Sequence, residues 1–480
     1  MTKLCLTLTD PSMDVNLALL EKHSPHMAEL RVDFAGPSAV KEISRFPSRT
    51  DIPLILTCRK KADGGVWTGS SADRESFLLD CLEGGFDYID LEEDEDSSAL
   101  PEKAAARQCR IIRSFHDFSK LPEDLEERLL KMDPHGDLVK AAVMPRGIAD
   151  VERLFRIGMS WKKDNLILLG MGDFGVPTRI LASRMNSFLT FCSPSDGEGA
   201  APGHMSIQTL RDVYRIDEIN GDTTLFGIIG DPVLHSRSPH IHNKGLANTG
   251  QNGILVPYTV DDVPAFFHLA EILDIKGFCT TVPHKQAVMK QLDWMSDSVR
   301  VIGACNTVVR EEDKWCGYNT DAEGFIIPLR KEKGDLRGLK AAVIGAGGAA
   351  RAIVYALVQE GCQISVFNRT TSKAEVLGHE MSSGFGSLED FISYPAGSFD
   401  LIIQTSSSGM EGKSVNGNPI ESYNFTGKEF LYDIIYTPAL TVIMKKAMNA
   451  GCSVLGGWSM LEEQARIQFR HFTGQELPVL

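Results

Sequence analysis

The chain lacks several features, and each absence excludes a class of protein. No apolar run approaches the roughly 18 residues of a membrane-spanning helix, and no basic, apolar leader opens the sequence. The 10 cysteines form no Cys-x-x-Cys pair and no paired Cys/His spacing, which favours buried, reduced thiols over a disulfide framework or a zinc site. Basic residues are not in excess, because the net charge is −15. We therefore expect a cytoplasmic protein without a nucleic-acid or membrane partner.

Residues 339–370 have the pattern of a dinucleotide-binding βαβ unit, in a chain whose 480 residues suffice for about three domains. The apolar run Ala341–Ile344 ends in a glycine turn, and a second apolar run, Ile364–Phe367, follows after an amphipathic helix. The turn consists of Gly345, Ala346, Gly347, Gly348, Ala349 and Ala350. Such glycines allow a tight bend and a close approach of the backbone to a pyrophosphate, while the helix start offers free N–H groups.

The end of the second apolar run distinguishes between two cofactors. An NAD-binding unit places an acid there, about 20 residues past the glycines, to bind the ribose 2′-hydroxyl. This chain has Asn368, Arg369 and Thr370 instead. Because an arginine suits a 2′-phosphate, the pattern predicts NADP.

The first 220 residues alternate apolar runs with helical patterns, and the runs number eight, which is the count of a compact (β/α)₈ barrel. The expected strands are Leu4–Thr9, Met27–Phe34, Pro53–Arg59, Tyr88–Glu92, Arg110–Phe118, Leu138–Pro145, Asn165–Gly172 and Phe188–Pro194. In this fold the chemistry takes place at the carboxyl ends of the strands. Polar residues gather at those ends, which packing alone does not explain.

Lys140 is the most informative of these polar residues, because it is a lone cation in an otherwise apolar strand. Burial inside a barrel would favour the neutral amine, which can attack a carbonyl, whereas a lysine at the rim would only reach solvent. His116, one strand earlier, is placed to move protons beside an imine, with a structural histidine as the alternative.

Several motifs of this segment together resemble the type I 3-dehydroquinate dehydratases. They are Ala-Glu-Leu-Arg-Val-Asp-Phe, Thr-Cys-Arg followed by Gly-Gly, Ser-Phe-His-Asp-Phe, Val-Lys-Ala-Ala and Ala-Pro-Gly. The resemblance implies that Lys140 forms a Schiff base with the substrate ketone, while His116 takes the neighbouring carbon's proton and helps water leave. The residues that it implies bind the substrate or line its pocket are Glu29, Arg31, Arg59 and Arg179.

Two positions depart from this family. The glutamate that orients the family's histidine is Asp63 here, which is one methylene shorter. The glutamine of the family's Ala-Pro-Gly-Gln is His204. We expect Asp63 to act on His116 with a shortened reach, and His204 to contact the substrate with a changed affinity or pH dependence.

After a linker at about 215–223, strand and helix patterns continue to alternate. They are expected at Leu225–Ile229, Ile254–Val260, Val263–Leu273, Gly277–Val282 and Lys285–Trp294. In a loop that opens a helix, Ser236 and Ser238 either bind a carboxylate or only cap the helix. The nearby histidines lack acidic partners and tetrahedral spacing, so we expect no metal.

Lys285 and Asp321 lie on separate loops ahead of the dinucleotide unit, where such a pair can move a proton to a ketone oxygen as hydride arrives. With the motifs Thr405-Ser-Ser-Ser-Gly-Met410, Asp433-Ile-Ile-Tyr436 and Met460-Leu-Glu-Glu-Gln464-Ala, the segment from residue 225 onward resembles the shikimate dehydrogenases. The resemblance makes Lys285 and Asp321 the catalytic pair, and it assigns the glycine turn and residues 368–370 to NADP. The residues that it implies for the shikimate ring are Ser236, Ser238, Thr281, Asn306, Tyr436 and Gln464.

The expected architecture is α/β throughout. A TIM barrel at 1–219 precedes a substrate-binding domain at 224–336, a Rossmann NADP-binding domain at 337–456, and a C-terminal helix at 457–480 that returns to the substrate-binding domain. The two halves resemble consecutive enzymes of aromatic biosynthesis. The first would convert 3-dehydroquinate to 3-dehydroshikimate, and the second would reduce that ketone with NADPH to shikimate.

Three alternatives stay open at this point. The barrel is a non-catalytic module that senses dehydroquinate, or the second half is an NAD-dependent quinate dehydrogenase, or the barrel is a Schiff-base aldolase. Arg369 disfavours the quinate enzyme, and the aldolase leaves the motifs around His116 and Arg59 unexplained.

Overall fold

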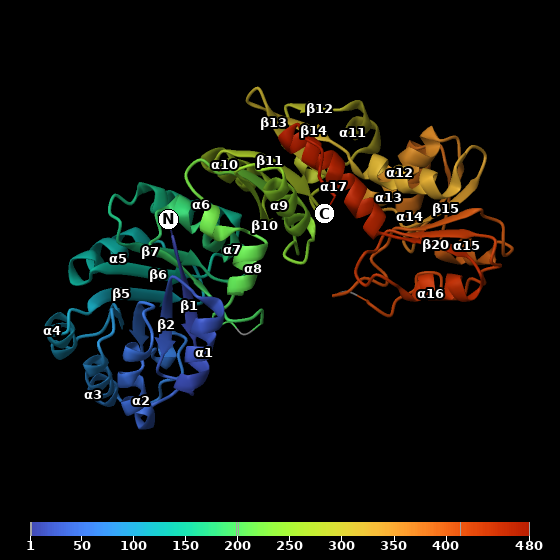
Figure 1. Cartoon of the computed structure of the whole chain (residues 1–480). Coiled ribbons are helices and arrows are strands. Elements are labelled where there is room, and N and C mark those ends of the chain that lie inside the picture. The colour runs from blue at the N-terminus through green and yellow to red at the C-terminus, as the bar shows by residue number, and fades with distance from the viewer. Residues whose placement is uncertain (1, 198, 200, 413, 480) are drawn as a thin grey trace. The chain divides into compact units, whose positions relative to one another are not determined.

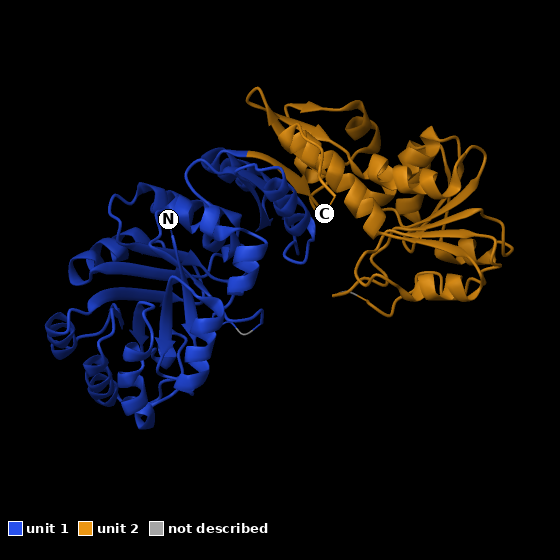
Figure 2. Cartoon of the chain, viewed as in Figure 1, with its two compact units in different colours: residues 1–275 blue, residues 276–480 orange. Residues whose placement is uncertain are grey.

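The computed structural model describes residues 2–197, 199, 201–412 and 414–479. The chain divides into two compact units, Met1–Ile275 and Lys276–Leu480 (Figure 2). The expected substrate-binding domain, residues 224–336, is shared between the two units, and the domain limits expected from the sequence stay predictions. All ten cysteines are free thiols, and nine of them are buried.

The first unit begins with a nearly closed barrel of eight parallel strands, which confirms the prediction from the sequence. The strands are β1 (Lys3–Leu8), β2 (Met27–Arg31), β3 (Leu54–Thr57), β4 (Tyr88–Glu92), β5 (Arg110–Asp117), β6 (Leu138–Val143), β7 (Leu166–Gly170) and β8 (Leu189–Cys192). Each strand from β7 back to β1 pairs with the next, and β8 joins β1. Where the ends of the sheet meet, Phe188 N donates to Leu166 O at 2.7 Å.

Helices lie around the outside of these strands (Figure 1). They are α1 (Met13–His23), α2 (Val40–Arg45), α3 (Ser71–Cys81), α4 (Ala99–Ala106), α5 (Leu125–Met132), α6 (Ile148–Ser160), α7 (Gly172–Ile180) and α8 (Ile207–Asp212). Inside the barrel each strand contributes a buried apolar side chain to one core, including Ile112 and Leu138. Because side chains alternate along a strand, the next residues on the same face are Ser114 and Lys140. The polar end of the barrel interior is therefore built on the same strands as its core.

The rest of the first unit packs on the barrel and completes one of its helices. It comprises β9 (Thr224–Gly230), α9 (Ser238–Asn248), β10 (Gly253–Thr259) and α10 (Val263–Leu273), with β9 and β10 paired in parallel. Helix α6 starts after Gly147, which has no side chain to cap it. Instead, Ile148 N donates to Asp261 Oδ1 at 2.9 Å, so the cap comes from the segment after β10.

The second unit opens with four strands of a mixed sheet, together with two helices. The strands are β11 (Ile275–Thr280), β12 (Trp294–Met295), β13 (Thr307–Glu311) and β14 (Lys314–Tyr318), and the helices are α11 (Asp297–Ile302) and α12 (Asp321–Lys333). The helix expected over Lys285–Trp294 is wrong, because only a 3-10 helix at Ala287–Gln291 forms there. The carbonyl of Lys285 accepts from Cys305 N at 2.7 Å, so it is bonded to a neighbouring segment rather than to an N–H of its own helix.

The glycine turn opens a doubly wound parallel sheet, as predicted. Its strands are β15 (Lys340–Ile344), β16 (Gln363–Phe367), β17 (Gly384–Gly386), β18 (Leu401–Gln404), β19 (Phe430–Asp433) and β20 (Ser453–Gly456). They lie in the order β17-β16-β15-β18-β19-β20, which is the strand order of dinucleotide-binding folds. Alternate residues of β15 face two different cores: Ala341 and Val343 pack in one, and Ala342 and Ile344 in the other. Burial on both faces explains why these strands are apolar throughout.

Helices cover both faces of this sheet. They are α13 (Gly348–Gln359), α14 (Thr371–Glu380), α15 (Leu388–Ser393) and α16 (Val442–Asn449). The last helix, α17 (Trp458–Thr473), packs closely on α12, since a Cβ built on Gly324 would lie 2.6 Å from the Cβ of Gln464. The absence of a side chain at position 324 thus lets the two helices approach each other.

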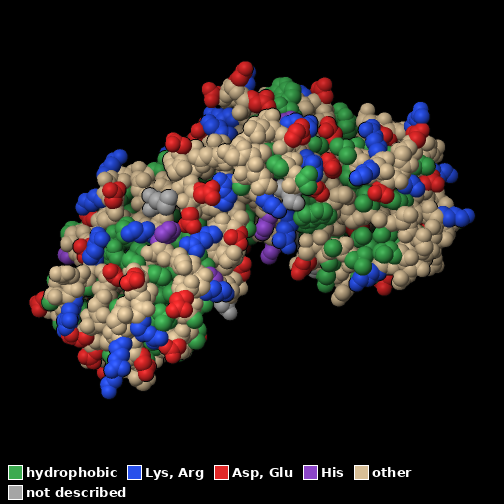
Figure 3. All heavy atoms as spheres, in the orientation of Figure 1, with side chains coloured by type: hydrophobic (Ala, Val, Ile, Leu, Met, Phe, Trp, Pro, Cys, Tyr) green, Lys and Arg blue, Asp and Glu red, His purple; other side chains and the backbone are tan. Residues whose placement is uncertain are grey.

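The surface carries charges of both signs. On the face that Figure 3 shows, Lys and Arg side chains lie among Asp and Glu side chains over both units. Within the described residues, no helix combines the length and the apolar character needed to cross a bilayer.

Candidate active sites

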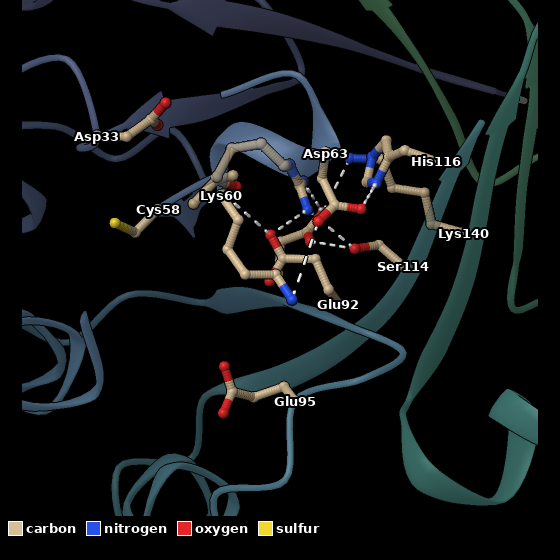
Figure 4. Close-up of polar contacts among 12 residues, drawn as sticks. Asp33, Cys58, Lys60, Asp63, Glu92, Glu95, Ser114, His116 and Lys140 are labelled. Carbon is tan, nitrogen blue, oxygen red and sulfur yellow. Dashed lines mark hydrogen bonds and ion pairs between the residues drawn. The ribbon is translucent and has the colours of Figure 1, made fainter. Parts of the chain in front are cut away.

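The eight barrel residues that the sequence singles out all line one cavity of about 50 Å³. They are Glu29, Arg31, Arg59, Asp63, His116, Lys140, Arg179 and His204. They come from strands β2, β5 and β6, from the segment after β3, from α7 and from the segment before α8. Figure 4 shows Lys140, His116 and Asp63 directed toward one another above Ser114 and Glu92.

Lys140 is buried in the wall of this cavity between two carboxylates. Its Nζ donates to Asp90 Oδ2 at 2.8 Å and lies 3.7 Å from Glu29 Oε1. The same ammonium lies 4.4 Å from the centre of the Phe191 ring. The amine is therefore inside the barrel and not at its rim. The role of Lys140 as the nucleophile stays a prediction.

A buried ionic network holds the carboxylates beside Lys140. Arg59 lies 2.9 Å from Asp90 Oδ2 through Nη2, while its Nη1 donates to Glu92 Oε1 and to Ser114 Oγ, both at 3.0 Å. Ser114 Oγ in turn donates to Asp90 Oδ1 at 2.5 Å. Burial raises the pKa of Asp90, but the charges of Arg59 and Lys140 outweigh it and hold that pKa well below its usual value. Asp90 is therefore a permanent anion beside the lysine.

His116 faces Lys140 as a neutral imidazole. Burial, together with the cations Arg59 and Lys140, holds the pKa of His116 well below its usual value. Its Nδ1 has no hydrogen-bond partner among the described residues, and the Asp63 carboxylate lies 3.9 Å away. This separation exceeds a hydrogen bond, as expected for a side chain that is one methylene short. Burial also raises the pKa of Asp63.

Arg179 and His204 form the other wall of the cavity. Arg179 is fully buried and donates through Nη2 to Pro202 O at 3.2 Å, but its Nε and Nη1 have no partner in the described part of the chain. Burial lowers the pKa of Arg179 to about 10, so it stays charged at neutral pH. Two unsatisfied donors on a buried cation suit a substrate carboxylate. Burial, with Arg179 close by, also holds the pKa of His204 well below its usual value.

Further residues complete the site: Asp90 and Glu92 are among the polar residues expected at the strand ends, whereas Asp33 and Ser114 were not predicted. The guanidinium of Arg31 donates through Nε and Nη2 to Asp33 at 2.9 and 2.8 Å, so Arg31 is braced rather than free. Asp33, Asp90, Glu92 and Ser114 belong to the site or support it. Their only signal in the sequence is a charged or polar residue that continues an inward-facing alternation, as in Ile112-Arg113-Ser114.

In the second unit the predicted pair Lys285 and Asp321 is in contact, with Lys285 Nζ donating to Asp321 Oδ2. Asn306 Nδ2 donates to the other carboxylate oxygen, Oδ1, at 2.9 Å. A Cβ built on Gly348 would lie 3.4 Å from Lys285 Cδ, so the start of α13 lies against the lysine side chain. The catalytic pair expected from the sequence is thus assembled next to the dinucleotide turn.

The residues expected to bind the shikimate ring occupy both units. Gln464, on α17, accepts a 3.4 Å hydrogen bond from Asn306 Nδ2. Thr281 follows β11, and Tyr436 follows β19. Ser236 and Ser238 lie at the start of α9 in the first unit, where Ser238 N donates to Ser236 Oγ at 3.2 Å. Their roles stay predictions.

The residues expected to hold the cofactor have a geometry that fits a dinucleotide phosphate. Gly345 has φ +121°, and a Cβ there would lie 2.4 Å from Thr405 Oγ1, so only glycine suits this turn. Nothing lies within 4 Å of a Cβ built on Gly347, and helix α13 starts at the next residue. Arg369 is exposed and has no ion-pair or hydrogen-bond partner in the described part of the chain. These features leave N–H groups and one cation available for phosphates.

Three models of protein families match consecutive parts of the chain. Type I 3-dehydroquinase matches residues 4–221, shikimate dehydrogenase substrate binding domain matches residues 228–308, and shikimate / quinate 5-dehydrogenase matches residues 329–434.

Individual relatives agree with these matches. The chloroplastic bifunctional 3-dehydroquinate dehydratase/shikimate dehydrogenase of Arabidopsis thaliana is 31% identical over 473 residues, covering 94% of this chain and 78% of that protein. The shikimate dehydrogenase (NADP(+)) of Caldanaerobacter subterraneus is 40% identical over 267 residues, which are 54% of this chain and 94% of that protein. A crystal structure of a shikimate dehydrogenase in complex with NADP+ is similar with a TM-score of 0.52 at 32% identity, covering 54% of this chain and 93% of that one. The chain belongs to the family of bifunctional 3-dehydroquinate dehydratases/shikimate dehydrogenases.

Proposed function

We propose that the barrel dehydrates 3-dehydroquinate to 3-dehydroshikimate and that the second unit, with NADPH, reduces 3-dehydroshikimate to shikimate. The proposal rests on the groups that surround two buried or partly buried lysines, Lys140 and Lys285. Lys140 lies among the carboxylates and the arginine of a closed barrel site, and Lys285 is paired with Asp321 beside a dinucleotide turn. Both sites are suited to small-molecule substrates.

The barrel chemistry follows from the order of its groups. Lys140 first gives an ammonium proton to neutral His116, and its free amine attacks the substrate ketone. His116 returns that proton to the former ketone oxygen, which leaves as water, and the resulting iminium draws electrons from the neighbouring carbon. Neutral His116 takes the proton from that carbon and returns a proton to the departing hydroxyl, which leaves as water. A second water hydrolyses the imine and frees the lysine. Asp90 stays ionised throughout and balances the cation beside it.

The reduction needs a proton donor at the ketone oxygen. Bound NADPH supplies the hydride. Lys285 gives its proton to the oxygen as charge develops there, while Asp321 orients the ammonium through the contact at Oδ2. Arg369 and the N–H groups at the start of α13 would hold the phosphates of the cofactor.

One coupled assay tests the proposal directly. When 3-dehydroquinate and NADPH are added to the purified chain, we expect the absorbance of the reduced nicotinamide to fall and shikimate to accumulate. Oxidation of NADPH with 3-dehydroshikimate but not with 3-dehydroquinate would contradict the dehydratase and favour a sensing barrel. Faster turnover with NADH and quinate than with NADPH and 3-dehydroshikimate would contradict the dehydrogenase assignment.

Replacement of Arg369 should separate the two nicotinamide cofactors. We expect Arg369→Ala to raise the KM for NADPH about 10- to 100-fold, because one charge-assisted hydrogen bond to a phosphate is lost. The KM for NADH should stay nearly unchanged, because NADH has no 2′-phosphate. Steady-state kinetics with both cofactors measure the difference. Arg337→Ala is the matched control, because that arginine is exposed in the same unit and, among the described residues, has its ion pair with Asp335 alone. Equal changes for NADPH and NADH would show that Arg369 does not read the 2′-phosphate.

A further inference from the structure

A buried chain of hydrogen bonds joins α17 to the catalytic carboxylate of the second unit. Gln468 lies one helical turn after Gln464 and is 2% exposed. Its Nε2 donates to Asn306 O at 3.3 Å and to Thr307 Oγ1 at 3.1 Å. Thr307 Oγ1 donates to Asn306 Oδ1 at 3.0 Å, and Asn306 Nδ2 donates to Asp321 Oδ1 at 2.9 Å. The chain therefore runs from Gln468 through two residues to Asp321.

Backbone groups fix the direction of this chain. Thr320 N, which can only donate, bonds Asn306 Oδ1 at 2.8 Å, so the amide nitrogen of Asn306 must face Asp321. Asn306 O, which can only accept, bonds the amide nitrogen of Gln468, so the oxygen of Gln468 faces away, where it accepts from the thiol of Cys279 at 3.3 Å. Gln468 donates to Thr307 Oγ1, so the proton of the Thr307 hydroxyl is left to donate. Its shorter contact is with Asn306 Oδ1, at 3.0 Å, against 3.4 Å to Thr320 Oγ1.

Every donor in the chain thus points toward the Asp321 carboxylate. Lys285 bonds the second oxygen of the same carboxylate, so Asp321 is held from both sides. Gln464, which is expected to contact the substrate, accepts from the same Asn306 amide at 3.4 Å. Bonds aligned in one direction polarise one another and strengthen the last of them.

We propose that Gln468 is a positioning residue for the reduction, which acts through Thr307 and Asn306 to hold Asp321, and thereby Lys285, at the ketone oxygen. The inference rests on the proposed catalytic pair. Gln468 does not reach the reacting atoms itself, because Asn306 and Thr307 lie between it and the carboxylate. Without the Gln468 amide, Thr307 loses the donor that orients its hydroxyl toward Asn306 Oδ1.

The first test replaces Gln468 by an apolar residue of similar length. We expect Gln468→Met to lower kcat for 3-dehydroshikimate reduction on the order of 10-fold, because displacement of a catalytic group by about 1 Å costs up to about 100-fold. The KM for NADPH should stay unchanged, since no cofactor contact is altered. The dehydratase activity of the same polypeptide reports the amount of chain in the assay. Met460→Ala is the control for packing, because Met460 lies buried in the same helix and should change the Tm without changing kcat.

Gln468→Glu gives a readout that a packing role would not produce. The protonated carboxyl can donate one hydrogen bond, whereas the carboxylate only accepts and faces the Asn306 carbonyl. We expect the reductase activity of this variant, relative to wild type at each pH, to recover as the pH falls. The activity of Gln468→Met relative to wild type should stay flat. Parallel profiles for both variants would contradict the inference.

A double-mutant cycle decides whether Gln468 acts through Asn306. Once Asn306→Ala has removed the link, Gln468→Met should cause no further loss of kcat, whereas independent effects would multiply. If Asp321→Asn is inactive but Gln468→Met turns over like wild type, this inference fails and the catalytic pair stands. If Asp321→Asn itself turns over like wild type, the proposed catalytic pair of Lys285 and Asp321 is contradicted, independently of Gln468.

Discussion

Lys140→Met will remove the dehydratase activity while the same polypeptide still reduces 3-dehydroshikimate. We expect a loss on the order of 10⁴-fold or more, because the nucleophile that forms the covalent intermediate is gone. The dehydrogenase rate, measured with 3-dehydroshikimate and NADPH, reports the amount of polypeptide in the same sample. Treatment of the wild type with 3-dehydroquinate and borohydride should leave a reduced adduct on Lys140, which peptide mass spectrometry locates.

The control for Lys140 is Lys131→Met, the same substitution at an exposed lysine of α5, which should leave both activities unchanged. Loss of Lys140 also deprives Asp90 and Glu29 of a cation, although Arg59 remains beside Asp90. A thermal melt therefore accompanies the kinetics. Binding of 3-dehydroquinate without any adduct would establish the sensing barrel instead.

Lys285→Met should block the reduction of 3-dehydroshikimate, the step that follows the dehydration. We expect reduction of 3-dehydroshikimate to fall about 10²- to 10⁴-fold, which is the usual contribution of a positioned proton donor. Asp321→Asn should act in the same direction, since the amide keeps the size of the carboxylate but not its charge. With 3-dehydroquinate and NADPH, both variants should accumulate 3-dehydroshikimate, which chromatography detects.

Lys290→Met is the matched control for Lys285, because Lys290 is an exposed lysine on the 3-10 helix that follows it. Titration with NADP+ shows whether the cofactor site survives in each variant. Full reductase activity in both Lys285→Met and Asp321→Asn would contradict the assignment and show that another group donates the proton.

Burial explains which parts were predictable. Nearly all residues of β15 and of the barrel strands other than β5 are buried, so these strands appear in the sequence mainly as apolar runs of strand length. Lys140 is conspicuous because a cation interrupts such a run. The dinucleotide turn is predictable for a different reason, since Gly345 needs a backbone conformation that other residues rarely adopt.

Contacts between distant segments explain which parts were not predictable. The residues near Lys285 in the sequence do not indicate that the backbone N–H of Cys305 bonds the Lys285 carbonyl, so the absence of a helix there could not be predicted. Gln468 is one polar residue among many in α17, and only the packing of that helix brings its amide to Asn306.

The carboxylate of Asp261 bears on how the two enzymes of this chain can be separated. Helix α6 belongs to the barrel, yet its first N–H is bonded by a residue more than 40 positions beyond the expected end of the barrel at 219. Dissection of the gene at that linker would free the dehydratase from its partner but leave α6 frayed, at a cost of about 1 kcal/mol for a lost cap. The two enzymes of this chain are therefore not structurally independent, because a residue beyond the barrel caps a helix of the barrel. A self-sufficient dehydratase carved from it would need a new capping side chain at Gly147, in the space that Asp261 vacates.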